Sequence, residues 1–505
     1  MAKRKREAVQ KQEAARKAIK AAPDVRKQIP SPDQQQPGDV TIQIVTGSYE
    51  RVLHGITATV SRPSADESSP QTAQFVDTFL FQAHASAIKC LALSPLPEQN
   101  TSEPHKIVLA SGGTDERVNL YNLSASPPAA DEKFPSVPTL AGNKILENPK
   151  NRELGSLLHH SSAITALYFP TRSKLLSAAE DNTISVTRTR DWSVVSTIKA
   201  PRPKIQGRPS GDTAPPGGAP AGVNDFAVHP SMKLMLTVGR GEKCMRLWNL
   251  VTGKKAGVLN FERKILESVL EGKYSTGEGR RISWDSEGEE FTVAFERGAV
   301  VFGIDSVPTR VLLPSPRTKL HQMKYVDVGM SSGNKRELLA MSTEDGRILF
   351  YSTKASVSTE SKDDSKPPLP AGQLIAQLGG KEHGQQGRIK DFEVLPVKMQ
   401  GWKSTFLIVT SGSDGAVKLW VLTEKEFPES PKKAKTPSNA QNGASSDNAV
   451  AQVGKLLGMY ESGNRITCMK AFVMLAPDAG DLDYSDLAES EEEEGENEED
   501  SSDSE

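Results

Sequence analysis

From Thr41 onward the chain is dominated by short apolar runs in which hydrophobic and polar residues alternate, separated by turn residues. Because successive side chains of a strand point to opposite faces, such runs predict β-strands that bury one face. No amphipathic helical pattern lies between them, which favours an all-β barrel, sandwich or propeller. We expect strands at residues 41–47, 52–60, 107–113, 164–169, 234–239, 291–295, 347–351 and 406–412.

These runs repeat on a common template, and the period distinguishes between the three all-β architectures. Without polar insertions each copy spans roughly 40 residues, which is the spacing of four-stranded propeller blades. The clearest copies pair residues 84–95 with 110–123, 160–170 with 176–192, and 388–397 with 409–422. Weaker copies cover residues 223–250, 281–305 and 338–352.

We expect a seventh, composite blade that joins the two ends of the repeat region. Residues 464–472 would supply one strand, and the strands within 41–60 would complete the sheet. A ring sealed in this way leaves no open sheet edge. The predicted organisation is a basic disordered arm at 1–40, a seven-bladed propeller at 41–475 and an acidic disordered tail at 476–505.

Long polar insertions interrupt the repeats, and we interpret them as disordered loops within the propeller because they are too poor in apolar residues to pack. They cover residues 61–74, 124–138, 206–222, 353–370 and 428–448.

The segment 410-TSGSDGAVKLW-420 presents a carboxylate on a tight Asp-Gly hairpin, because Gly adopts the positive φ angle that such a turn needs. Asp115 and Asp181 occupy equivalent places in other copies, each with a histidine upstream and a Ser or Thr four residues before it. A single Ser–His–Asp set would suggest nucleophilic catalysis. Recurrence in several copies favours a structural role.

The sequence resembles WD-repeat proteins, with 247-LWN-249 and 418-KLW-420 at the place of the naming dipeptide. In that family the matching His, Ser/Thr, Asp and Trp form a buried hydrogen-bonded tetrad in each blade. The resemblance implies three such sets, which are His84, Ser111, Asp115 and Tyr121; His160, Ser177 and Asp181, followed by Thr187; and His383, Thr410, Asp414 and Trp420. Only the last set is complete, and Asp414→Ala is expected to cost about 1–3 kcal/mol.

A narrower resemblance is to the PAK-interacting-protein group, which includes the maintenance-of-killer factors of yeasts. It rests on 44-IVTGSYERVLHG-55, 157-LLHHSSAIT-165 and 247-LWNLVTGK-254, and covers about residues 44–472. It implies a nucleolar factor that serves assembly of the large (60S) ribosomal subunit and processing of pre-rRNA. The group's name also implies binding of a p21-activated-type kinase.

Charge is concentrated at the two ends, although the 62 basic and 64 acidic residues give a net charge of only −2. Residues 1–27 hold ten Lys/Arg and three Asp/Glu, while residues 481–505 hold fourteen Asp/Glu and no base. The opening Lys3, Arg4, Lys5 and Arg6 suggest nuclear targeting, an RNA-contacting arm or a solubilising tail. The acidic end suits basic partners or solubility alone, with Ser490 and Ser502 as candidate phosphorylation sites.

Three widely spaced cysteines, Cys90, Cys244 and Cys468, indicate neither a disulfide framework nor a zinc site, and a reducing compartment is expected. No phosphate-binding loop, membrane span or secretory signal is evident. We therefore predict a non-enzymatic scaffold without a cofactor, a monomer within a larger complex, located in the nucleolus and nucleus. Preribosomal proteins and assembly factors are the expected partners, with pre-rRNA as a further candidate. The alternatives are an adaptor that restrains a protein kinase, and an enzyme or substrate receptor using the propeller's central funnel.

Overall fold

The structure is a computed structural model of the chain. It describes residues 39–62, 72–96, 106–127, 137–138, 144–202, 222–272, 275–329, 335–357, 369–397, 402, 404–428 and 450–475. The chain divides into two compact units, Met1–Pro37 and Gly38–Glu505, and all described residues belong to the second. The predicted insertions fall largely outside the described residues. So do the predicted arm and tail, and their boundaries stay predictions.

The first sheet joins strands from both ends of the described chain. Its order is β31 (Ile466–Val473), β1 (Val40–Ser48), β2 (Val52–Val60), β3 (Ala73–Gln82), β8 (Lys144–Ile145) and β7 (Val137–Pro138). β31 pairs with β1 antiparallel, from Ile42 opposite Val473 to Ser48 opposite Ile466. The last inner strand is therefore hydrogen-bonded to the first strand of the chain.

Four further sheets follow, and their strands run mostly in chain order. The second holds β4 (Ile88–Leu93), β5 (Lys106–Gly113), β6 (Val118–Ser124) and β9 (Arg152–Leu157). The third holds β10 (Ile164–Thr171), β11 (Lys174–Ala179), β12 (Thr183–Arg188) and β13 (Val194–Lys199). The fourth holds β14 (Val223–Val228), β15 (Leu234–Gly239), β16 (Cys244–Asn249) and β17 (Lys254–Asn260). The last in sequence holds β26 (Ile389–Val397), β27 (Thr405–Gly412), β28 (Ala416–Thr423) and β30 (Lys455–Glu461).

A nine-stranded sheet lies between these in sequence and consists of two four-stranded runs. One run is β18 (Arg281–Trp284), β19 (Glu290–Ala294), β20 (Ala299–Gly303) and β21 (Pro308–Leu312). The other is β22 (Leu320–Asp327), β23 (Glu337–Thr343), β24 (Arg347–Val357) and β25 (Ala371–Gly379), with β29 (Ala451–Gln452) beside β25. The runs meet through one parallel pair, Val311 opposite Ala371. Each four-stranded run has the size of one propeller blade, and the described residues form seven such runs.

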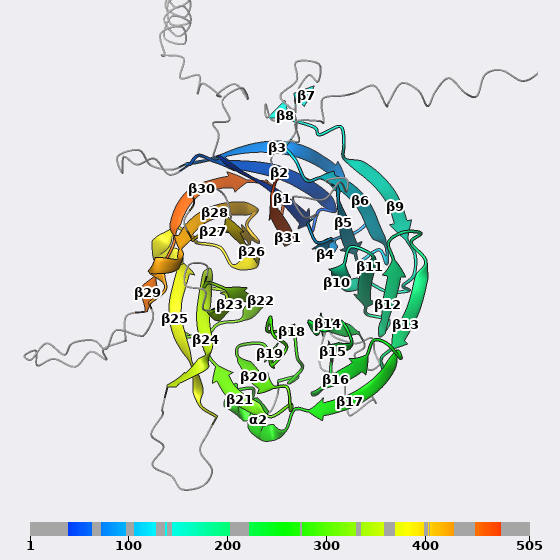
Figure 1. Cartoon of the computed structure of the whole chain (residues 1–505), viewed down its shortest axis with the longest axis vertical. Coiled ribbons are helices and arrows are strands. Elements are labelled where there is room, and N and C mark those ends of the chain that lie inside the picture. Colours follow the sequence, from blue (N-terminus) through cyan, green and yellow to red (C-terminus); the bar gives the residue numbers. More distant parts are fainter. Residues whose placement is uncertain are drawn as a thin grey trace, which may run out of the picture. The chain divides into compact units, whose positions relative to one another are not determined.

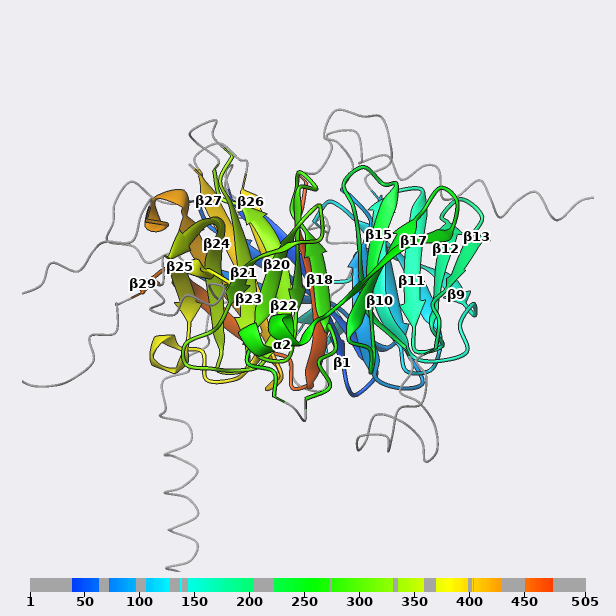
Figure 2. The ribbon, with the colours of Figure 1, turned by 90° about the horizontal axis from the view of Figure 1, so that it is seen from below.

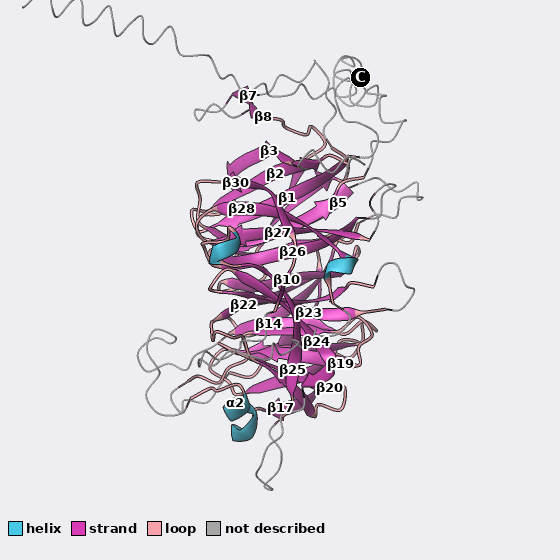
Figure 3. Cartoon of the chain, turned by 90° about the vertical axis from the view of Figure 1, so that its left-hand side faces the viewer, coloured by secondary structure: helices cyan, strands magenta, loops and turns pink. Residues whose placement is uncertain are grey.

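The sheets are arranged around a ring (Figure 1). The innermost strands are β4, β10, β14, β18, β22, β26 and β31. Seen from the side and in the view coloured by secondary structure, strands are the main element of the described ribbon (Figures 2 and 3). The prediction of an all-β propeller is confirmed. No helix among the described residues is both long and apolar enough to cross a membrane.

Apolar side chains fill the space between neighbouring sheets. Among the described residues the buried apolar side chains form seven clusters, each built from two consecutive four-stranded runs. The cluster between the first and last sheets includes Ile44 and Met469 from one and Leu407 and Leu419 from the other, all of them fully buried. Burial of this kind is the main stabilising contribution to the ring, because alternate residues of each strand leave water on closing.

Three local features can be compared with the prediction, and one of them agrees with it. The Asp-Gly hairpin joins β27 and β28 as predicted, and Gly415 takes a φ of 86°, the left-handed region that favours glycine. The insertion expected from residue 353 begins later, because β24 continues to Val357, which pairs with Ala371. The short helix α2 (Arg263–Ser268) was not predicted, and it packs Ile265 and Leu266 into a core cluster.

Candidate functional site

The first predicted tetrad is assembled at the start of the second sheet. His84 lies between Ser111 and Asp115, with 2.8 Å from Nε2 to the serine Oγ and 3.0 Å from Nδ1 to the carboxylate. A carboxylate only accepts hydrogen bonds, so Nδ1 donates, and Nε2 of the neutral ring accepts from the serine hydroxyl. The Ala85 amide also donates to Asp115, at 2.9 Å. Burial opposes ionisation of Asp115, but this amide and His84 outweigh it and lower its pKa.

This arrangement has the connectivity of a hydrolytic triad, and burial decides against that role. Ser111 has an exposed fraction of 0 % and His84 of 4 %, so no substrate can reach the hydroxyl. The fourth member, Tyr121, is buried behind them, and burial followed by the nearby Glu153 raises its pKa to about 12. The phenol therefore stays neutral. The set links the loop that holds His84 to the strand that holds Ser111.

The second predicted set has the same geometry in the third sheet. His160 lies 2.8 Å from Ser177 through Nε2 and 3.3 Å from Asp181 through Nδ1. The Thr183 hydroxyl donates to Asp181 at 2.6 Å. At the tryptophan position, Thr187 is fully buried, and its hydroxyl has no hydrogen-bond partner among the described residues. This blade therefore lacks the fourth link.

Asp181 makes the stability of this blade sensitive to acid. Burial opposes its ionised form, but hydrogen bonds from His160, Thr183 and Ser161 outweigh burial and hold its pKa well below its usual range. Because the folded-state pKa is depressed, the stabilisation is present above the unfolded pKa of about 3.9 and is lost as the pH falls below it.

We therefore expect Asp181→Asn to reduce the free energy of unfolding most at pH 7, with the deficit shrinking as the pH falls below about 4. Urea unfolding at a series of pH values measures this difference. Asp305→Asn is the control, because it makes the same change at an exposed aspartate in another sheet. A deficit for Asp181→Asn that is constant with pH would contradict the assignment.

The prediction that His383 completes the last set is wrong. His383 is exposed in the short 3-10 helix η3 (Lys381–His383) and makes no contact with Asp414. Asp414 is itself exposed, and its carboxylate accepts from the Ala416 amide at 3.2 Å. The expected cost of Asp414→Ala therefore falls below the predicted range, because no buried partner would be left unsatisfied. The structure does bring Trp420 to Thr410, at 3.2 Å.

Gln385 stands where the third histidine was expected. It precedes the first residue of β26 by four positions, as His84 and His160 precede the first residues of β4 and β10. It is 1 % exposed and donates to the Gly387 carbonyl at 3.1 Å. The four-residue distance from the inner strand identifies Gln385, whereas the nearest histidine in the sequence does not occupy this place.

Polar links in two places were not predicted. In the fourth sheet Trp248 donates to Thr237 at 2.9 Å, and Glu242 forms an ion pair with Arg246. Between the first and last sheets, Asp77 accepts from His54 at 2.9 Å and from Tyr460 at 2.5 Å. The Trp248 link had a sequence signal in the LWN motif. The Asp77 link had none, because its members are far apart in the chain.

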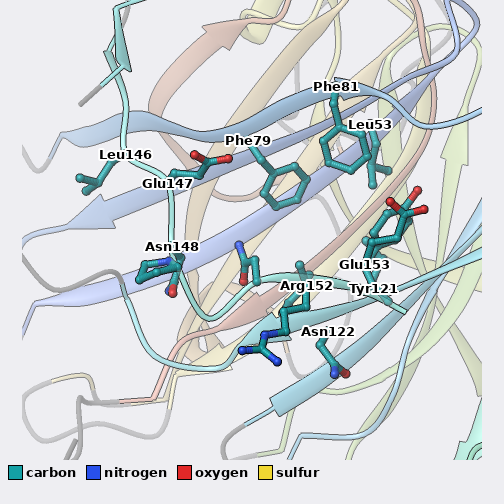
Figure 4. A pocket seen from close by; sticks show the side chains of 14 residues that line it. Leu53, Phe79, Phe81, Tyr121, Asn122, Leu146, Glu147, Asn148, Arg152 and Glu153 are labelled. Atoms are coloured by element: carbon teal, nitrogen blue, oxygen red, sulfur yellow. The ribbon is translucent and has the colours of Figure 1, made fainter. Parts of the chain in front are cut away.

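A concave site of about 400 Å³ lies between the first and second sheets (Figure 4). Phe79, Phe81 and Tyr121 form its apolar wall, and Phe81 is 40 % exposed. Arg152 and Glu153 of β9 are among its polar lining residues. An aromatic wall with a charged margin suits an apolar side chain of a binding partner.

Charged side chains also meet on the inner strands. Glu393 of β26 lies 2.6 Å from Lys324 of β22 and 2.8 Å from Lys470 of β31. Burial opposes ionisation of Glu393, but the two ammonium groups outweigh burial and lower its pKa. Three strands distant in sequence are thus linked by one carboxylate. No sequence pattern indicated this, since the residues are single charges in separate repeats.

The described residues contain no group of three or more His, Cys, Asp or Glu side chains placed to hold a metal ion. Cys90, Cys244 and Cys468 are free thiols. Lys3 to Arg6, Ser490 and Ser502 lie outside the described residues, so their proposed roles stay predictions.

The ring of four-stranded sheets and its His–Ser–Asp links are typical of WD-repeat propellers. Residues 151–187 match the family model for the WD domain, G-beta repeat. The chain is similar to Protein MAK11 of Saccharomyces cerevisiae, at 26 % identity over 76 % of this chain and 78 % of that protein. It is also similar to the p21-activated protein kinase-interacting protein 1-like of Xenopus laevis, at 22 % identity over 77 % of each chain. A third relative is Shk1 kinase-binding protein 15 of Schizosaccharomyces pombe, at 26 % identity over 62 % of this chain and 69 % of that protein.

Proposed function

We propose that this protein is a non-enzymatic WD-repeat scaffold in ribosome biogenesis, where it serves assembly of the large (60S) subunit and pre-rRNA processing through protein contacts. The observation that carries the proposal is the similarity to Protein MAK11 over about three quarters of both chains. It agrees with the maintenance-of-killer resemblance of the sequence. The buried serines of the His–Ser–Asp sets support a role in binding and not in catalysis.

A rigid ring suits this role, because sites on separate blades can hold several partners at fixed separations, which raises their effective concentration for one another. Preribosomal proteins and assembly factors are the proposed partners, with pre-rRNA as a further candidate. The proposed location is the nucleolus and nucleus, with the basic residues Lys3 to Arg6 as the targeting element.

The experiment that tests the proposal is affinity purification of the full chain followed by sedimentation. We expect the chain to co-migrate with large-subunit precursors, and its depletion to reduce mature large subunits relative to small subunits. A chain found only as a free protein in the gradient, with unchanged subunit ratios after depletion, would contradict it.

The second candidate function is an adaptor that binds and negatively regulates a p21-activated-type kinase. The names of two relatives support it, since one is called kinase-interacting and the other kinase-binding. The same purification separates the two candidates, because this one predicts recovery of a kinase without large-subunit precursors.

A further inference from the structure

Corresponding positions at the start of six of the seven inner strands carry an unbalanced set of charges. In β4, β10, β14, β26 and β31 the second residue lies at a β-bulge, and in β22 His321 lies within a similar register shift. A bulge re-aims its side chain away from the regular ladder. These six positions are Lys89, Thr165, Asn224, His321, Lys390 and Thr467, whereas β18 has no such bulge and begins at Arg281. Three are basic and none is acidic.

The neutral members and one basic member already have partners. Thr165, Asn224 and Thr467 donate to backbone carbonyls. Lys89 pairs with Glu180 at 3.0 Å, and Arg240 shares that carboxylate at 2.9 Å. On this side of the ring the inner-strand cation Lys89 is therefore already paired.

The side formed by β18, β22 and β26 differs. Arg281 donates to the His321 carbonyl at 3.2 Å, and its guanidinium lies 3.9 Å from Asp225. Lys390 has no acceptor within hydrogen-bond distance among the described residues. We call Arg281, Lys319, His321, Arg388 and Lys390 the basic sector.

The imidazole of His321 reports the field that these cations create. Burial first, and then Lys390, Arg388, Arg281 and Lys319, lower its pKa to about 4. Its Nε2 is buried and has no hydrogen-bond partner. The cations themselves remain accessible, with side-chain exposed fractions of 35 % for Arg281, 39 % for Arg388 and 42 % for Lys319. The basic sector thus combines solvent-accessible cationic side chains with the Nε2 atom of His321, which makes no hydrogen bond to the described residues.

We propose that the basic sector binds carboxylate side chains of an acidic polypeptide segment, with Lys390 as the principal contact. The carboxylates at the margin of the basic sector favour a polypeptide over RNA as its ligand. Glu344 lies 3.5 Å from Arg388, and Glu296 lies 3.0 Å from Lys319. These acids would repel a continuous phosphate backbone, whereas a single acidic side chain reaches Lys390 between them. The inference rests on the proposed scaffold function in one respect, which is that a polypeptide partner binds the propeller.

The test measures binding of a fluorescent peptide, in which single glutamates are separated by neutral residues, to the purified full chain by anisotropy at low salt. We expect Lys390→Gln to weaken binding about tenfold, because it removes one charged hydrogen bond. Lys390→Arg should restore most of the affinity. Lys254→Gln, which removes the same charge from an exposed position on β17, should bind like the unchanged protein. Equal thermal melting of the variants shows that the fold is intact.

A second readout is the pKa of His321, followed by NMR. Bound peptide should raise it, because added negative charge offsets the surrounding cations. The inference is overturned if Lys390→Gln and Lys254→Gln bind alike, if no binding occurs, or if single-stranded RNA binds more tightly and depends on Lys390.

The acidic C-terminal residues 481–505 are a competing occupant. In a chain that ends at Gly480, Lys390→Gln should weaken peptide binding by the same factor as in the full chain, and a much larger factor in the shorter chain would overturn assignment of the sector to a separate partner. None of these results depends on co-migration with ribosomal precursors, so this inference and the proposed function fail separately.

Discussion

A chain that ends at Arg465, and so lacks β31, is expected not to fold cooperatively. In β31 the side chains of Ile466, Met469 and Phe472 are at most 4 % exposed and contribute to two core clusters. Each such side chain contributes roughly 1.5–3 kcal/mol of burial. Their loss is comparable with a total stability of about 5–15 kcal/mol, and β1 would become an open edge.

Circular dichroism and thermal melting of the purified proteins measure this effect. The matched control ends at Asp478, which keeps β31 and removes only residues beyond the described ones. We expect the control to melt cooperatively near the temperature of the full chain. A cooperative transition in the shorter protein would show that the ring does not depend on β31.

Replacing His84 with alanine is expected to lower the free energy of unfolding by about 2–4 kcal/mol. The substitution leaves the Ser111 hydroxyl without its imidazole partner and removes one donor from Asp115, which is 8 % exposed. Buried polar groups left without partners carry their full desolvation cost.

The control for this change is His383→Ala, which alters the same residue type at an exposed site. We expect it to change stability by no more than about 0.5 kcal/mol. Urea unfolding of both variants gives the comparison. Equal effects would mean that the His84 set does not stabilise its blade, and a large effect of His383→Ala would restore the original third tetrad.

Local pattern predicted the strands well, because alternation of apolar residues reports which face is buried and Asp-Gly reports a tight turn. It located His84 and His160 correctly, since in those copies the histidine stands four residues before an inner strand. The prediction failed for His383, because this residue was chosen by its type and not by its distance from the inner strand. There the loop forms a 3-10 turn and Gln385 is the buried residue.

The sequence by itself determined the all-β propeller class, because a period of strands and turns is local information carried by each repeat. Only the tertiary structure decided which single residues meet across the ring. Asp77 and Tyr460, or Lys324, Glu393 and Lys470, become neighbours when separate blades close against one another. The basic sector is of this kind, because its charge arises from residues on two inner strands and the adjoining loops, each unremarkable in its own repeat.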